Sequence, residues 1–190
     1  NRAEVVDKLY LNDSIRLSFS RDRPGRVRAS AAFREGYVYA TSELSAQAGF
    51  AWKIGLDNVT GKFEDRGWSA PMGFSTSTPS VCNGRVYLGT GEHGHPGALI
   101  CLNDSCGDVI WSYPVEAGIK SSPALSMARK RPRILFTTSQ VNGSVYCLED
   151  GGERAELLWR LNPPDNGYIL GGAPISDGQV YFGSEGDQHS

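Results

Sequence analysis

The amino-acid sequence predicts an all-β fold, a β-propeller of four blades with four antiparallel strands each. Three observations lead to this prediction: a hairpin signal, a repeat of about 46 residues, and half-repeats at the two ends of the chain. The chain has 190 residues with 10% aromatics, 23 Gly and 10 Pro, a composition typical of short strands joined by many turns. This length fits a single domain over residues 1–190.

The stretch 78–114 contains the clearest copy of the repeat. Asn83-Gly84 lies between two short runs of β-branched and aromatic residues. Both central residues of a type I′ turn need positive φ, so this dipeptide is a strong hairpin signal. Two further apolar runs, 98–102 and 108–113, follow after a loop and a polar turn. The stretch therefore predicts four short strands joined by turns.

Three series of residues recur with one period. The second strand of each repeat contains one residue of the series Val38, Val86, Ile134 and Val180, at spacings of 48, 48 and 46. The third strand ends at Leu11, Leu56, Leu102 or Leu148, at spacings of 45, 46 and 46. The fourth strand is closed by Trp68, Trp111 or Trp159, at spacings of 43 and 48. A period of 40 to 50 residues with four strands per repeat is typical of propeller blades.

The two ends of the chain match complementary halves of one repeat. Residues 5–19 match only the third and fourth strands, and residues 172–183 match only the first and second. We therefore expect a last blade built from both termini, because closure removes exposed sheet edges. The expected blades are 162–190 plus 1–20, 21–70, 71–115 and 116–161. The alternative is an arc of a larger ring with six to eight blades.

The charge pattern argues against two classes of partner. The net charge is −2 and the isoelectric point is about 5.9, which gives no general case for binding nucleic acid or an anionic membrane. No run of 18 apolar residues is present, so no membrane span is expected. The basic run 129–133 is interpreted as a solvated loop, inserted between the first and second strands of its repeat.

Two features favour secretion or the cell surface. The chain begins at Asn1, which is consistent with a processed chain or a trimmed one. Acceptor triplets for N-glycosylation are more frequent than chance predicts. They begin at Asn12, Asn58, Asn103 and Asn142, and three of them fall in the turn after the third strand. We expect at least one of them to carry a glycan.

The four cysteines fit an oxidising compartment, although they allow three full pairings. Cys101 and Cys147 occupy equivalent strand positions and are interpreted as small buried hydrophobic residues. Cys82 ends a first strand, and Cys106 lies in the turn between a third and a fourth strand. These two positions fall on one rim of a meander, so a Cys82–Cys106 disulfide is the expected pairing.

No motif indicates catalysis, a cofactor or a metal. His93 and His95 lie in a Gly-rich loop with no third ligand nearby, and there is no Cys-X-X-Cys. Four aspartates are expected in turns, where Asp hydrogen-bonds its own backbone. They are Asp57, Asp104, Asp150 and Asp177. The sequence therefore predicts a protein that is not an enzyme.

Several segments resemble the repeats of the pyrroloquinoline-quinone-like, or quinoprotein-type, β-propellers. They are 56–62, 84–89, 109–113 and 121–124. The resemblance covers essentially the whole chain, and it implies that the tryptophan ending the fourth strand docks between blades. For an enzyme of this family, the resemblance would imply an eight-bladed ring with two adjacent cysteines and with a calcium ion held by Glu, Asn and Asp. Here no two cysteines are adjacent, so the resemblance favours a non-catalytic scaffold branch without bound quinone.

The functional hypothesis is a secreted, glycosylated, non-catalytic propeller that assembles with copies of itself into a surface layer or an extracellular filament. Glycans are possible further partners. One alternative is a module that binds a carbohydrate or a peptide. The other is an arc of a larger quinoprotein-like propeller.

Overall fold

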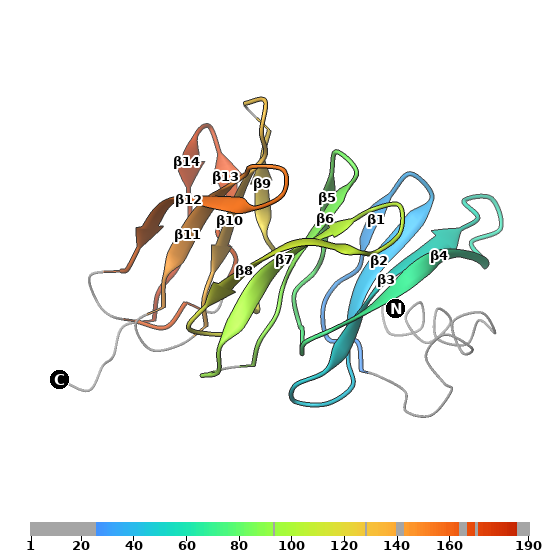
Figure 1. Cartoon of the computed structure of the whole chain (residues 1–190), viewed down its shortest axis with the longest axis horizontal. Coiled ribbons are helices and arrows are strands. Elements are labelled where there is room, and N and C mark those ends of the chain that lie inside the picture. Colours follow the sequence, from blue (N-terminus) through green and yellow to red (C-terminus); the bar gives the residue numbers. More distant parts are fainter. Residues whose placement is uncertain are drawn as a thin grey trace.

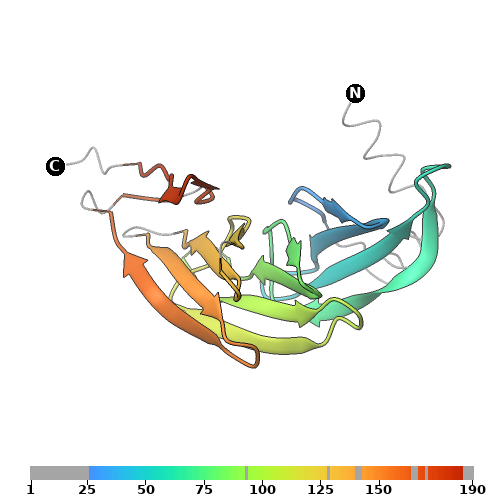
Figure 2. The same ribbon diagram turned by 90° about the horizontal axis from the view of Figure 1, so that it is seen from above.

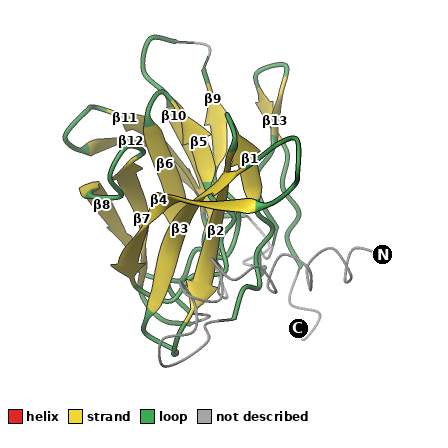
Figure 3. Ribbon diagram, turned by 90° about the vertical axis from the view of Figure 1, so that its right-hand side faces the viewer, coloured by secondary structure: helices red, strands yellow, loops and turns green. Residues whose placement is uncertain are grey.

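The structure, a computed structural model, describes residues 26–92, 94–127, 129–139, 143–163, 167–169 and 171–185. Within these residues the regular structure consists of strands and contains no helix (Figure 3). No described segment is therefore a helix that could cross a membrane. Three four-stranded antiparallel sheets and one two-stranded hairpin stand side by side in a row (Figure 1), which Figure 2 shows to be curved.

Each whole sheet is a meander, in which every strand pairs with its neighbour along the chain. The first sheet contains β1 (Ala32–Arg34), β2 (Tyr37–Glu43), β3 (Gly49–Leu56) and β4 (Phe63–Met72). The second sheet contains β5 (Ser80–Cys82), β6 (Arg85–Gly89), β7 (Gly97–Asn103) and β8 (Val109–Val115). The third sheet contains β9 (Ala124–Ser126), β10 (Arg133–Thr137), β11 (Val145–Asp150) and β12 (Ala155–Leu161). The terminal hairpin contains β13 (Ile175–Ser176) and β14 (Gln179–Val180).

The expected hairpin at Asn83-Gly84 is confirmed. Both residues have positive φ, 49° and 71°, as a type I′ turn requires. The same geometry recurs at Glu35-Gly36 and at Asp177-Gly178. In the third sheet β9 ends at Ser126 and β10 begins only at Arg133, so the connection is longer, at the place where the sequence indicates an insertion.

The register of the sheets repeats with the sequence. In each whole sheet the pairing between the third and fourth strands shifts at one place, just before the end of the third strand. These β-bulges lie at Ile54/Gly55, Cys101/Leu102 and Cys147/Leu148.

Leu102 and Leu148 occupy one structural position, opposite Val86 and Ile134. In the first sheet Ile54 takes this position, opposite Val38, and Leu56 lies two residues further on, so the leucine series is shifted there.

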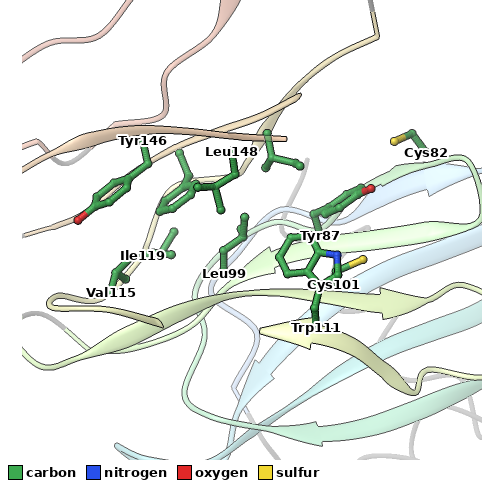
Figure 4. Packing of buried hydrophobic residues seen from close by; sticks show 11 residues of the cluster. Cys82, Tyr87, Leu99, Cys101, Trp111, Val115, Ile119, Tyr146 and Leu148 are labelled. Carbon is green, nitrogen blue, oxygen red and sulfur yellow. The ribbon is translucent and has the colours of Figure 1, made fainter. Parts of the chain in front are cut away.

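The core lies between neighbouring sheets, so the middle strands are buried on both faces. On β6, Val86 and Leu88 pack against the first sheet, and Tyr87 packs toward the third. The cluster between the second and third sheets contains Leu99, Trp111, Tyr146 and Leu148, which converge in Figure 4. Each large apolar side chain buried in this way contributes about 1.5–3 kcal/mol.

Small polar residues join the sheets near the first strands. Thr41 Oγ1 donates to the carbonyl of Ser77 at 2.9 Å, and Ser77 Oγ donates to the carbonyl of Ser121 at 2.9 Å. Thr137 Oγ1 continues the series by donating to the carbonyl of Gly171 at 2.7 Å. Small side chains let the backbones approach closely enough for these hydrogen bonds to form.

The terminal hairpin forms one end of the row (Figure 1). The terminal hairpin packs on the third sheet through Val145, Ile169 and Ala173, with Val180 and Phe182 beside them. It lies at the end of the row opposite to the first sheet (Figures 1 and 2). The expected strands in residues 5–19 lie outside the described residues, so the shared last blade stays a prediction.

Candidate interaction surface

Each whole sheet carries one row of three side chains paired across its second, third and fourth strands. These docking rows are Tyr39–Lys53–Trp68, Tyr87–Cys101–Trp111 and Leu135–Cys147–Trp159. The first two rows face the next sheet along the chain, as their contacts show. The third row lies on the face that packs against the terminal hairpin, because its neighbour Val145 contacts Ile169 and Ala173.

The first docking row binds Asp104, in the turn between β7 and β8 of the second sheet. The Trp68 indole donates to the Asp104 carbonyl at 2.8 Å, and Tyr39 Oη donates to Oδ1 at 2.8 Å. Lys53 Nζ lies 2.9 Å from Oδ1 and also donates to the carbonyl. Burial, together with the hydrogen bond to Asp104, raises the pKa of the Tyr39 phenol above its usual range. The row thus holds the turn of the next sheet by polar contacts.

The second docking row binds Asp150, whose side chain is 2% exposed at the end of β11. The Trp111 indole donates to Oδ1 at 3.2 Å, and Tyr87 Oη donates to Oδ2 at 2.6 Å. Arg85 Nη1 donates to both oxygens at 3.0 and 2.9 Å. Burial, with the nearby Asp150 charge, raises the pKa of the Cys101 thiol to about 12, so this thiol stays protonated at neutral pH. The buried carboxylate is therefore paired and hydrogen-bonded, as burial of a charge requires.

The two acceptors share one sequence position. Asp104 and Asp150 each lie two residues after a repeat leucine, Leu102 or Leu148. We call these Leu-X-Asp segments, 102–104 and 148–150, docking turns.

The expectation that such aspartates bond their own backbone is confirmed for Asp57, at the amide of Val59, and for Asp150, at the amide of Gly152. The contacts of Asp104 and Asp150 with the preceding sheet are additional to this expectation. The recurrence of Asp two residues after the leucine was the sequence signal that could have shown this.

The third docking row differs in the exposure of its tryptophan, because Leu135 and Cys147 are buried. Trp159 is 39% exposed, whereas Trp111 at the equivalent position is 5% exposed.

Other apolar residues of β12 are exposed as well. Leu161 pairs with Val145, on the face of Trp159, whereas Leu157 pairs with Leu148, whose side chain packs toward the second sheet. Together with Trp159 they form the β12 patch, which consists of Leu157, Leu158, Trp159 and Leu161. Contiguous exposed apolar residues of this kind mark interaction sites.

The predicted glycan acceptors have different environments. Asn58 is exposed in the turn between β3 and β4. Asn103 is half-buried, and its Oδ1 accepts hydrogen bonds from the amide and hydroxyl of Ser105 at 2.8 and 2.7 Å. Asn12 and Asn142 lie outside the described residues. Of the two described acceptors, Asn58 is the more accessible.

All four cysteines are free thiols, so the structure does not contain the expected Cys82–Cys106 disulfide. Cys82 is buried in the core between the second and third sheets, whereas the exposed Cys106 thiol donates to Asp108 Oδ2 at 3.1 Å. The two residues do share a rim, but β5 and β7 lie two strands apart. Two strand spacings amount to about 10 Å, and the Cα atoms of a disulfide lie within about 7 Å of each other.

The histidines and the basic residues singled out in the sequence do not come together in one site within the described residues. The described residues contain no cluster of His, Cys, Asp or Glu suited to a metal ion; His95 lies in an exposed turn, and His93 lies outside the described part of the chain. In the basic loop, Arg131 and Arg133 each have a nitrogen 3.9 Å from a Glu149 carboxylate oxygen. That carboxylate offsets part of the positive charge of the loop.

Comparisons with known proteins support the fold. No family model and no curated sequence matches the chain. Among solved structures, the chain is similar to BamB from Moraxella catarrhalis, with 14% identity and a TM-score of 0.57 over 85% of this chain and 48% of that one. It is also similar to quinohemoprotein alcohol dehydrogenases, each with 15% identity and a TM-score of 0.51. The enzyme from Comamonas testosteroni matches over 73% of this chain and 21% of its own, and the enzyme from Pseudomonas putida HK5 over 82% and 30%.

These neighbours are β-propellers of the quinoprotein type, so the row of sheets has a propeller-like fold, as the sequence predicts. The chain spans less than half the length of each of these three proteins. At this level of identity the similarity concerns the fold and not the activity.

Proposed function

We propose that this protein is a non-catalytic propeller module that works by protein–protein contact through the β12 patch. One observation carries the proposal: three equivalent tryptophans lie within the fourth strands, not at their ends as the sequence predicts, and only Trp159 of the three lies on a face that no whole described sheet covers. Covering Trp159 and its leucine neighbours would add about 1 kcal/mol for each side chain, because less than half of each is still exposed. The patch is therefore suited to a stable contact with another protein surface.

The partner that fits the proposal is another copy of the same chain. Depending on the angle between copies, association of this kind builds either a closed assembly or the open surface layer or extracellular filament that the sequence suggests. Secretion with a glycan at Asn58 is consistent with this role, because Asn58 is exposed and lies on the first sheet, away from the β12 patch (Figure 1).

A non-catalytic role is supported by the state of the buried polar groups. The Asp150 carboxylate is engaged by Arg85, Tyr87 and Trp111, which leaves it no lone-pair direction toward a substrate. Raised pKa values keep the thiols of Cys82, Cys101 and Cys147 protonated, because all three are buried. These groups stabilise the fold and are poorly suited to act as nucleophiles.

The test is the mass of the protein in solution, measured by light scattering during size-exclusion chromatography. We expect the 190-residue chain to associate and the Leu161→Asp variant, changed on the face of Trp159, to run at the 20.6 kDa of one chain. The control is Val109→Asp, because Val109 is likewise an exposed apolar residue, on the fourth strand of the second sheet. A Leu161→Asp variant that associates like the wild type would refute the proposal.

Glycosylation has its own test. Produced in a eukaryotic secretory host, the protein is expected to carry a glycan on Asn58, so the Asn58→Gln variant should lose the mass of one glycan. Intact mass spectrometry measures the difference. An unchanged mass would remove Asn58 as an acceptor.

A second candidate function is binding of a carbohydrate or a peptide. A hollow of about 360 Å³ lies against the first strands of the three whole sheets, with the exposed Phe33 beside Arg34 and Leu125. An aromatic ring next to a guanidinium suits the face of a sugar or a peptide side chain. Binding of the wild type to a glycan or peptide array, together with no binding of the Phe33→Ala variant, would support this second function.

A further inference from the structure

We propose that residues 5–19 of a second copy cover the β12 patch, so that two chains complete each other's last sheet. This inference rests on the proposed function and names the partner of the same surface. It is drawn from the docking turns, from the number of strands in the last sheet and from the position of the first described residues.

The N-terminal region contains a third copy of a docking turn. Residues 11–14 read Leu-Asn-Asp-Ser, and residues 102–105, which contain the turn bound by Trp68, have the same four residues. Asp13 therefore stands two residues after a repeat leucine, as Asp104 and Asp150 do. The chain has three docking rows and three such Leu-X-Asp turns, and the described contacts join two rows to two of the turns.

The third docking row is suited to this partner. Trp68 binds its turn through a backbone carbonyl, so an indole N–H needs no particular side chain at the acceptor. The third row has Leu135 and Cys147 where the first row has Tyr39 and Lys53, which makes its surroundings more apolar. The segment 5–19 offers matching apolar residues on both sides of its turn.

The number of strands also fits. The terminal hairpin has two strands where the whole sheets have four, and in the described residues β14 pairs only with β13. Residues 5–11 and 15–19 have the pattern of a third and a fourth strand. Addition of this pair to β14 would satisfy the backbone groups of an open sheet edge.

The geometry of the row favours a second copy as the source of the segment. Arg26 is joined to Glu43 at the end of β2, in the first sheet, and the β12 patch lies toward the other end of the row (Figure 2). The chain between residues 19 and 26 can span about 25 Å at most. Reciprocal exchange between two copies closes the assembly at a pair.

The experiment mixes two full-length variants, each damaged at one side of the contact. Leu161→Asp changes the patch, and Leu11→Asp changes the segment. In analytical ultracentrifugation we expect the wild type at twice 20.6 kDa and each variant alone at 20.6 kDa. An equal mixture should regain the mass of a pair, because one intact patch then meets one intact segment. Recovery on mixing would also show that both variants fold.

Other results would overturn the inference. If Leu161→Asp is a single chain but Leu11→Asp still pairs, or if the mixture stays at one chain, something else covers the patch, and the proposed function survives. If the wild type is a single chain with Trp159 protected from acrylamide quenching, the segment binds within its own chain and the exchange is refuted. If both variants pair like the wild type, or if the wild type is a single chain with Trp159 exposed, the inference and the proposed function both fail.

Discussion

Asp150 accepts hydrogen bonds from Arg85, Tyr87, Trp111 and the amide of Gly152, which makes it the polar centre of the contact between the second and third sheets. Asp104 has the equivalent position between the first and second sheets, but its side chain is 24% exposed. Its carbonyl rather than its carboxylate holds the tryptophan. The two aspartates should therefore differ in their effect on stability.

We predict that Asp150→Ala lowers the free energy of unfolding by about 3–5 kcal/mol, since it leaves Arg85 without its buried partner. Asp104→Ala should cost about 1–2 kcal/mol, because solvent reaches Lys53 and the Trp68 hydrogen bond remains. Urea unfolding measures both values. If both variants lost the same free energy of unfolding, the difference in burial between Asp150 and Asp104 would not affect stability.

Alkaline pH should destabilise the protein. Burial and the nearby aspartates raise the pKa of the Tyr39 and Tyr87 phenols, and burial raises the pKa of the Cys101 thiol to about 12. These groups bind protons more tightly in the folded state, so their contribution is complete at neutral pH. It is lost as the pH rises past the unfolded-state values of about 8.5 for Cys and 10 for Tyr.

The midpoint of urea unfolding, followed from pH 7 to pH 11, tests this. We expect it to fall above about pH 8.5, and to fall less steeply in the Tyr87→Phe variant. A constant midpoint through pH 10.5 would contradict the account.

Among the elements, the turn between β7 and β8 shows how closely the sheets approach. A Cβ atom on Gly107 would lie 2.7 Å from Cε3 of the Trp68 ring, and Gly107 has a φ of 82°. Gly84 has a similar φ of 71°, but a Cβ there would meet no atom within 4 Å. The pair separates the effect of the tryptophan contact from that of the backbone conformation.

Both glycine variants should lose about 1 kcal/mol from backbone strain. Gly107→Ala should lose about 1–3 kcal/mol more, because the added methyl group displaces Trp68 from its docking turn. Thermal unfolding with the tryptophan emission maximum as a second signal measures this. Equal losses in Gly107→Ala and Gly84→Ala would argue against a tight contact between the turn and the ring.

Trp111 and Trp159 allow a comparison of equivalent strand positions. In dilute solution, where association is absent, Trp111→Ala should cost about 3–5 kcal/mol because its ring is buried. Trp159→Ala should cost about 1 kcal/mol because the ring is partly exposed. Comparable losses at low concentration would show that the β12 patch is covered within one chain.

The local elements could be predicted from the sequence better than the contacts between them. Asn83-Gly84 indicated its hairpin because the signal lies within the turn itself. The role of Asp150 depends on Arg85 and Tyr87, which lie in another sheet, so its turn alone could not reveal it. Cys82 and Cys106 share one rim, as the sequence predicts, but they do not pair, because β6 separates β5 from β7.

At the scale of the whole molecule, the row of sheets has two different ends. One end is the first sheet, and the other combines the β12 patch with the two-stranded terminal hairpin. Contacts between different ends build rings or open chains, depending on the angle between successive copies. The repeat period predicted the sheets, whereas the arrangement of the ends depends on residues 5–19, outside the described part of the chain.

Oxidative footprinting of the tryptophans in the 190-residue chain, read by mass spectrometry over a range of protein concentrations, tests the central claim most directly. We predict that Trp159 is protected at high concentration and becomes reactive on dilution, while the buried Trp111 stays protected throughout. If Trp159 instead reacts equally at all concentrations, the β12 patch is not an interaction surface between copies of this protein.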